Sequence, residues 1–113
     1  MNSAWKSAVA YVEKYARELS VLSRSEILAL PLISESNRPD IPAGFIVTIE
    51  HGPMLNGTSS VTVEAGKFIL FGIRWRSVIA GFELTPEGQL QHYPLRWVNQ
   101  STKERKRYLS WTA

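Results

Sequence analysis

Five stretches decide the fold of this chain: FIVTIE at residues 45–50, VTVE at 61–64, KFILFGIRW at 67–75, VIAGFEL at 78–84 and QLQHYPLRW at 89–97. They are rich in β-branched and aromatic residues, which favour strands. In the first stretch Phe45, Val47 and Ile49 recur at every second position, which is the period of a strand with one buried face. The pattern predicts an antiparallel β-meander of about five strands.

The expected turns follow from the residues between these stretches. Ala65-Gly66 is expected to be a two-residue turn before the strand at residues 67–75. That strand is apolar on both faces, which is typical of a strand in the middle of a covered sheet. Thr85-Pro86-Glu87-Gly88 predicts a further turn, because proline presets φ and glycine accepts positive φ. Pro94 favours an edge position for the last strand, because proline lacks a backbone N–H.

Helices are expected on either side of the meander. Apolar residues at helical spacing predict an amphipathic helix over about residues 4–20. This helix then either extends toward Pro31 or is followed by a short second helix capped by Ser23 or Ser25. Turn and breaker residues predict a loop over residues 32–42. Ser-Thr-Lys-Glu at residues 101–104 is a capping box, which predicts a short C-terminal helix.

The chain is therefore expected to be a single α+β domain spanning residues 1–113. Its N-terminal helix would pack on a curved antiparallel meander, with the short C-terminal helix at the end. The order of elements resembles that of cystatin-like and NTF2-like domains, and this resemblance implies a sheet wrapped around the N-terminal helix.

The composition limits the chemistry that the chain could perform. It contains no cysteine, so it forms no disulfide, thiolate nucleophile or cysteine metal site. No metal site or cofactor is expected, because no H-x-H, H-E-x-x-H or glycine-rich nucleotide motif occurs. No apolar run approaches the length of a membrane span, and charged residues interrupt the N-terminal region. We therefore expect a cytoplasmic protein without a membrane partner.

Charge is distributed unevenly along the chain. The net charge is +3, but residues 1–65 hold five basic and seven acidic groups, whereas residues 66–113 hold eight basic and three acidic groups. This asymmetry predicts a positive face that attracts an anionic partner. The same half contains Arg and Trp, the residue types enriched in interface hot spots. The expected partner-binding residues are Arg74, Trp75, Arg76, Arg96, Trp97, Lys103, Arg105 and Arg107.

Protein binding is the function that these features favour. Size, composition and the helix-then-meander order resemble the small bacterial immunity proteins, and this resemblance implies a toxin inhibitor that neutralises its partner by direct binding in the cytoplasm. Inhibitors that cover a basic cleft tend to be acidic, whereas this chain is basic. A toxin partner would therefore present an acidic surface, or contact the more acidic N-terminal half.

Two other functions stay open. Single-stranded nucleic acid would bind if Trp75 and Trp97 shared a surface with the C-terminal basic residues, because bases stack on exposed tryptophan. A small ligand-binding or enzymatic cone would instead need a cavity with polar walls. Its general-base candidate is Glu83, and His51 and His92 would form an acid–base pair on a concave sheet face. No nucleophile motif occurs, so the chain is not expected to be an enzyme.

Overall fold

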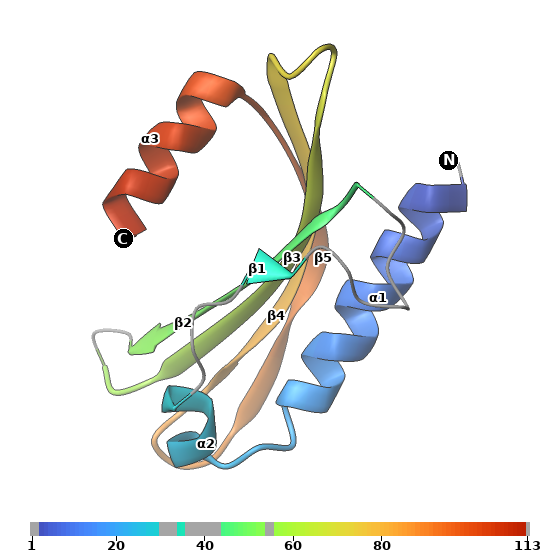
Figure 1. Ribbon diagram of the computed structural model, residues 1–113. Helices are drawn as coiled ribbons and strands as arrows, with labels where there is room; N and C mark the ends of the chain where they lie inside the picture. The colour runs from blue at the N-terminus through green and yellow to red at the C-terminus, as the bar shows by residue number, and fades with distance from the viewer. Residues whose placement is uncertain (1–2, 30–33, 36–43, 54–55, 113) are drawn as a thin grey trace.

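The computed structural model describes residues 3–29, 34–35, 44–53 and 56–112 (Figure 1). The elements follow one another along the chain as α1 (Ser3–Leu19), α2 (Arg24–Leu28), β1 (Ser34–Glu35), β2 (Ile46–Pro53), β3 (Ser59–Ile69), β4 (Arg74–Leu84), β5 (Leu90–Ser101) and α3 (Thr102–Thr112). This confirms the α+β class, with α1 and the short α2 before the meander and α3 after it. The predicted loop at residues 32–42 lies outside the described residues, apart from β1.

The sheet is antiparallel, and its strands are ordered β1-β2-β3-β4-β5. Since β1 has only two residues, the sheet consists of four long strands with a short addition at one edge. The meander therefore has four strands rather than about five. The difference arises because residues 61–64 lie inside β3, and residues 67–75 are divided between the end of β3 and the start of β4.

The predicted turn at Ala65-Gly66 is wrong, because β3 continues through both residues. Gly66 lies beside the Trp75 side chain, and a Cβ atom on Gly66 would come within 2.5 Å of the Trp75 ring. The glycine therefore permits a close approach between two strands and does not mark a turn. Residues 67–75 are likewise not one strand. They contain the end of β3, a tight turn and the start of β4.

Other local predictions are confirmed. α1 spans nearly the expected residues, and Ser23 caps α2 with a complete capping box. Gly88 has φ of +85° and donates its N–H to the carbonyl of Thr85 at 3.0 Å, so the β4–β5 turn forms where proline and glycine predict it. The Ser101 hydroxyl accepts from the N–H of Glu104 at 3.1 Å at the start of α3.

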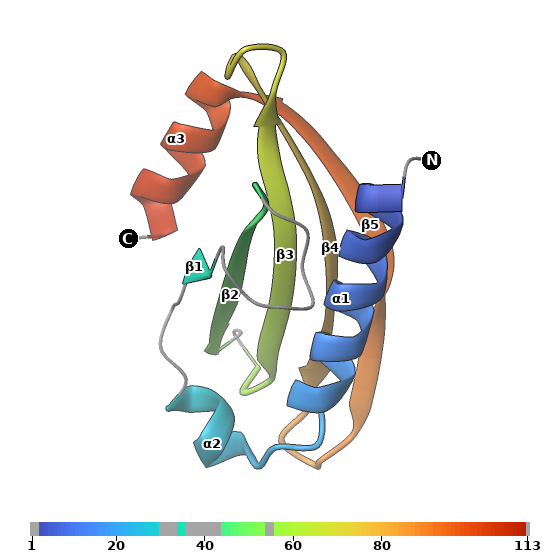
Figure 2. The same cartoon turned by 45° about the vertical axis from the view of Figure 1, so that its right-hand side comes forward.

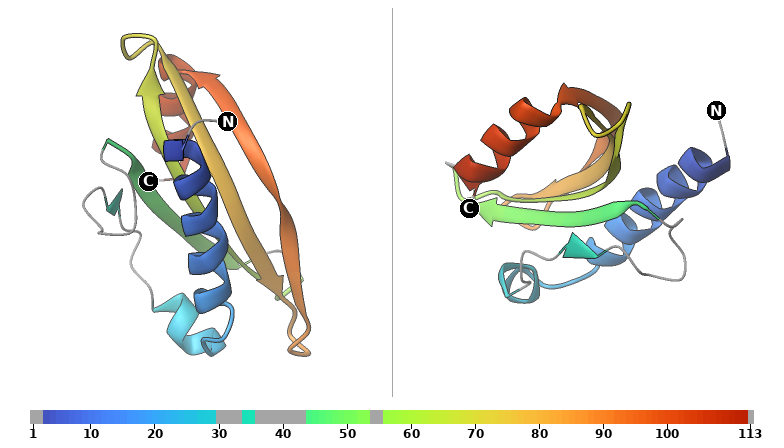
Figure 3. Two further views of the ribbon diagram at one scale, coloured as in Figure 1. Left: turned by 90° about the vertical axis from the view of Figure 1, so that its right-hand side faces the viewer. Right: turned by 45° about the horizontal axis from the view of Figure 1, so that its top comes forward.

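The two long helices lie on opposite faces of the sheet (Figure 3). α1 lies along β3 and β4 (Figure 2). Side chains alternate between the faces of a strand, so Val61, Val63 and Ala65 of β3 pack against α1, whereas Glu64 faces α3. The core between α1 and the sheet consists chiefly of Trp5, Ala8, Tyr11, Val12, Ala16, Leu19, Phe45, Val47, Ile49, Val61, Val63, Ala65, Val78, Ala80 and Phe82.

The long strands bend toward α3, so α3 lies on the concave face of the sheet and α1 on the convex face (Figure 1). The resemblance to cystatin-like and NTF2-like domains implied that the N-terminal helix lies on the concave face, whereas α1 lies on the convex face. The physical reason lies in the two sheet faces. The face that the apolar stripe of α1 covers is continuously apolar, whereas the face toward α3 carries Thr48, Glu50, Thr62 and Glu64.

Candidate functional site

The β3–β4 hairpin ends in an exposed apolar turn, defined here as the tip: Leu70, Phe71, Gly72 and Ile73 (Figure 1). Leu70 and Ile73 are 61% and 63% exposed, and Phe71 is fully exposed. Leu70 and Phe71 also have φ of +51° and +58°. This left-handed conformation costs an L-residue roughly 1–2 kcal/mol. The chain therefore holds large apolar side chains in water on a strained turn, a combination that points to function.

The tip is tied to α3 and lies at a basic end of the molecule. The backbone N–H of Thr102 donates to the carbonyl of Ile73 at 3.0 Å, and the Thr102 hydroxyl donates to the carbonyl of Gly72. Residues 67–76 and 101–107 together contain seven basic residues and a single glutamate. Arg74 directly follows the tip and exposed Lys103 directly follows Thr102, so positive charge lies beside the apolar tip.

A buried ion pair fixes α3 to the sheet. Arg105 Nη2 lies 2.5 Å from Glu64 Oε1, and Nη1 lies 3.2 Å from Oε2. The same carboxylate accepts from Trp75 Nε1 at 3.2 Å and from the Ser77 hydroxyl at 2.6 Å. Glu64 and Arg105 are only 7% and 5% exposed. Buried charges are tolerated when they are paired and hydrogen-bonded, and this carboxylate meets both conditions.

Two tyrosines on the concave face donate to carboxylates. Tyr108 donates its hydroxyl to Glu50 at 2.6 Å, and Tyr93 donates to Glu83 at 2.9 Å. Burial and the hydrogen bond to Glu50 raise the pKa of Tyr108 to about 12. Burial, followed by the bond to Glu83, also raises the pKa of Tyr93. Both phenols are therefore neutral hydrogen-bond donors, and each donates to one oxygen of a carboxylate.

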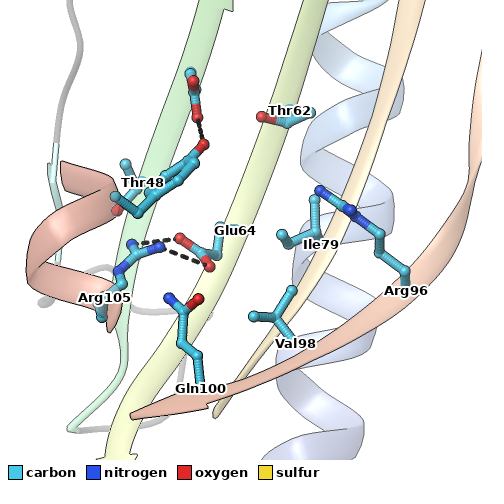
Figure 4. A pocket seen from close by; sticks show the side chains of 10 residues that line it. Thr48, Thr62, Glu64, Ile79, Arg96, Val98, Gln100 and Arg105 are labelled. Carbon is cyan, nitrogen blue, oxygen red and sulfur yellow. Dashed lines mark hydrogen bonds and ion pairs between the residues drawn. The ribbon is translucent and has the colours of Figure 1, made fainter. Parts of the chain in front are cut away.

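The concave face contains an open pocket of about 260 Å³ between the sheet and α3 (Figure 4). The guanidinium of Arg96 reaches over Ile79 from β5, and Thr62 faces it from β3 (Figure 4). A second pocket of about 420 Å³ shares these three residues and continues over Gly81 and Pro94. The two pockets form one groove with an arginine between them.

The expected partner-binding residues do not form one surface. Trp75 is 1% exposed and Arg105 is buried in the ion pair, so both serve internal packing. Arg76 lies on the convex side, its guanidinium carbon 4.9 Å from the Trp5 ring and 4.8 Å from the Trp97 ring. Trp75 and Trp97 therefore lie on opposite faces, and the shared tryptophan surface expected for nucleic acid is not formed.

The remaining expected residues divide between the tip and the concave face. Arg74 begins β4 directly after the tip. Lys103 and Arg107 are exposed on α3. Arg96 is next to Trp97 on β5, so its side chain points to the opposite, concave face. Of the expected set, Arg74 and Lys103 lie beside the tip, and Arg96 stands in the groove.

The catalytic candidates also separate. His51, Val61, Phe82 and His92 form one row across four strands. Three strand spacings place the two histidines roughly 14 Å apart. Their row belongs to the convex face, because Val61 and Phe82 are part of the core under α1. Glu83 shares the concave face with Ile79, as expected, but its carboxylate accepts from a tyrosine.

Within residues 3–29, 34–35, 44–53 and 56–112, no three acidic or histidine side chains are grouped as metal ligands. No helix in the same ranges has both the length and the apolar character needed to cross a bilayer.

Two features were missed from the sequence, and each had a local signal. The tip lies within KFILFGI, an apolar run interrupted by Gly72, which also fits a turn. Glu64 is a single acid within the apolar stretch VTVEA, where an acid requires a buried partner if its face is covered. The partner, Arg105, lies 41 residues further along the chain, so no local pattern identifies it.

Comparison with known proteins identifies no relative of this chain. No protein family, curated protein or solved structure matches it. Its candidate sites are therefore defined by its own residues and geometry.

Proposed function

We propose that this chain is a protein-binding module that inserts the tip into an apolar pocket of a partner protein, in the manner of an immunity-type inhibitor. The exposure of Leu70, Phe71 and Ile73 on the β3–β4 hairpin carries the proposal. Full burial of one such side chain contributes about 1.5–3 kcal/mol. Aromatic residues are also enriched at the centres of protein interfaces.

The charge around the tip specifies the chemistry of the partner. After Arg74, the first acidic residue on β4 is Glu83. Exposed Lys103 directly follows Thr102, the residue through which α3 contacts the tip. Complementarity therefore requires carboxylates around the partner's pocket. Such charges accelerate association and make its rate depend on salt.

The attachment of the tip to the body supports the same function. Thr102 bonds to the tip, and Arg105 in the same helix is held by Glu64 on β3. The hairpin is thus supported from two sides before any partner arrives. Preorganisation of this kind lowers the entropy cost of binding.

The nucleic-acid alternative receives less support from the same geometry. Trp75 is buried, and the Trp97 ring is already occupied by the Arg76 guanidinium. A stacking surface for bases needs exposed aromatic rings.

A photo-crosslinking experiment in the organism that produces the protein would test the proposal. A photoreactive phenylalanine analogue replaces Phe71, and a matched protein carries it at Glu87, an exposed position in the β4–β5 turn at the other end of the sheet. We expect one protein adduct from position 71 and none of the same mass from position 87. The adduct is identified and its protein purified.

Binding of the purified partner then decides the matter. Leu70→Asp should weaken binding of the partner by about 10-fold or more, because it replaces an apolar anchor with a negative charge that the partner's carboxylates repel. Val21→Asp is the matched control, because Val21 is also an exposed apolar residue and lies in the turn after α1, away from the tip. Equal effects of the two substitutions, or binding to oligonucleotides or anionic vesicles in place of a protein, would overturn the proposal.

A further inference from the structure

We propose that the groove on the concave face binds a small organic anion, a carboxylate attached to an apolar group, through Arg96. This site is separate from the tip, and nothing in the protein-binding proposal requires it. Four features of the groove lead to this inference: an available cation, an apolar floor, a larger pocket with no carboxylate in its lining, and an opening to solvent.

The cation is Arg96. Across the ranges described, it forms no ion pair with any carboxylate. Glu50 and Glu83, the two carboxylates of this face outside the buried ion pair, each accept a hydrogen bond from a tyrosine hydroxyl. Glu64 is neutralised by Arg105. An arginine fork with five N–H donors is thus available in the groove, and its planar geometry suits a carboxylate.

The floor beside this cation is apolar. Arg96 pairs across the strands with Ile79, and the larger pocket extends from there over Gly81 and Pro94. A Cβ atom at Gly81 would come within 2.4 Å of the Val61 carbonyl, so the strands approach closely there and no side chain fills the groove. A flat ring or short alkyl chain could lie on this floor while its carboxylate meets Arg96.

The larger pocket has no carboxylate in its lining, and its polar side chains are Thr62, Tyr93 and Arg96. Thr62 lines this pocket from β3, whereas Gln100 lies near the Glu64–Arg105 ion pair in the smaller pocket (Figure 4). The pockets of about 260 and 420 Å³ accommodate a molecule of the size of benzoate. In the larger pocket, the apolar floor and the Arg96 guanidinium, with no carboxylate in the lining, together select a monoanion with an apolar body.

Nuclear magnetic resonance titration of the full chain with benzoate tests this inference. We expect saturable shifts of the backbone amide signals of Thr62, Ile79 and Gly81, with a Kd below about 1 mM. Benzamide, which has the same shape without the charge, should cause much weaker shifts. The amide signals of the tip should not move.

Variants assign the effect to the guanidinium. Arg96→Gln should weaken benzoate binding by about 10- to 100-fold, the range expected for loss of a charge-assisted hydrogen bond. Lys103→Gln removes the same charge from an exposed position outside the groove and should leave binding within twofold. Because Arg96 is exposed, its variant should retain the wild-type circular dichroism and melting temperature.

Three results would overturn the inference: no saturable shift with benzoate, equal binding of benzamide, or undiminished binding to Arg96→Gln. Leu70→Asp separates the two proposals. It removes the tip's anchor for a partner protein and should leave benzoate binding unchanged.

Discussion

Removing either partner of the buried ion pair should destabilise the protein, but by different amounts. Arg105→Ala leaves the Glu64 carboxylate in the middle of β3, only 7% exposed and without a cation. It cannot escape, because β3 is paired on both sides. Loss of one partner from a buried pair costs about 3–5 kcal/mol. Arg105→Ala should lower the free energy of unfolding by that amount.

Glu64→Gln should cost less, about 1–3 kcal/mol, the penalty of hydrogen bonds lost or left unmade. Within residues 102–108, Arg105 is the one buried side chain of α3, so little else holds this part of the helix against the sheet. If α3 moves away, the Arg105 guanidinium reaches water. The double variant Glu64→Gln/Arg105→Ala should then be less destabilised than the sum of its parts.

Urea unfolding measures the three free energies, and hydrogen exchange measures the protection of α3. Exchange should accelerate in α3 for both single variants, whereas the core strands stay protected. Lys106→Ala, at an exposed position of α3, is the control and should change stability by less than about 0.5 kcal/mol. A Glu64→Gln cost equal to or above that of Arg105→Ala, with α3 still protected, would refute the reasoning.

Three further predictions concern single sites. Gly66→Ala should lower the free energy of unfolding by about 1–3 kcal/mol in urea titrations, because the new Cβ would overlap the Trp75 ring; Gly52→Ala, which meets nothing within 4 Å, should have a much smaller effect. The pKa of Tyr108 is about 12 when folded and 10.0 in the reference state, so the unfolded state binds fewer protons above pH 10. The resulting stability is present below pH 10 and lost as pH rises toward 12, and Tyr108→Phe should remove this part of the alkaline decline in melting temperature. Phe71→Asn should raise the free energy of unfolding by up to about 1 kcal/mol, since asparagine tolerates φ of +58°, while it weakens partner binding; a loss of stability would show that Phe71 packs against the body.

Local sequence signals predicted the elements well where their cause was local. The period of α1, the cap at Ser23 and the turn ending at Gly88 each depend on residues a few positions apart, and each appears where expected. Gly66 shows the limit of such signals. A glycine after alanine is equally compatible with a turn and with a strand whose backbone packs closely against an aromatic ring. Only the position of Trp75 distinguishes the two.

The candidate sites were less predictable than the fold. Arg96 and Trp97 are adjacent in the chain and were expected to act together, but strand alternation places them on opposite faces. Trp75 resembled an exposed anchor, yet it is buried beside Glu64. The register of β4 on β5 decides the first outcome, and the register of β3 on β4 decides the second.

The sequence by itself determined the class of the domain, the amphipathic N-terminal helix, the antiparallel strands, the capped C-terminal helix and the positive charge of the C-terminal half. These properties depend on short-range periodicity and composition, which each segment carries on its own. Only the tertiary structure decided which residues meet: Glu64 with Arg105, Arg96 with the apolar floor of the groove, and the tip with the start of α3. The physical reason is that side chains far apart in the chain are brought together by strand register and by the two faces of the sheet, and a one-residue shift in register would exchange those faces.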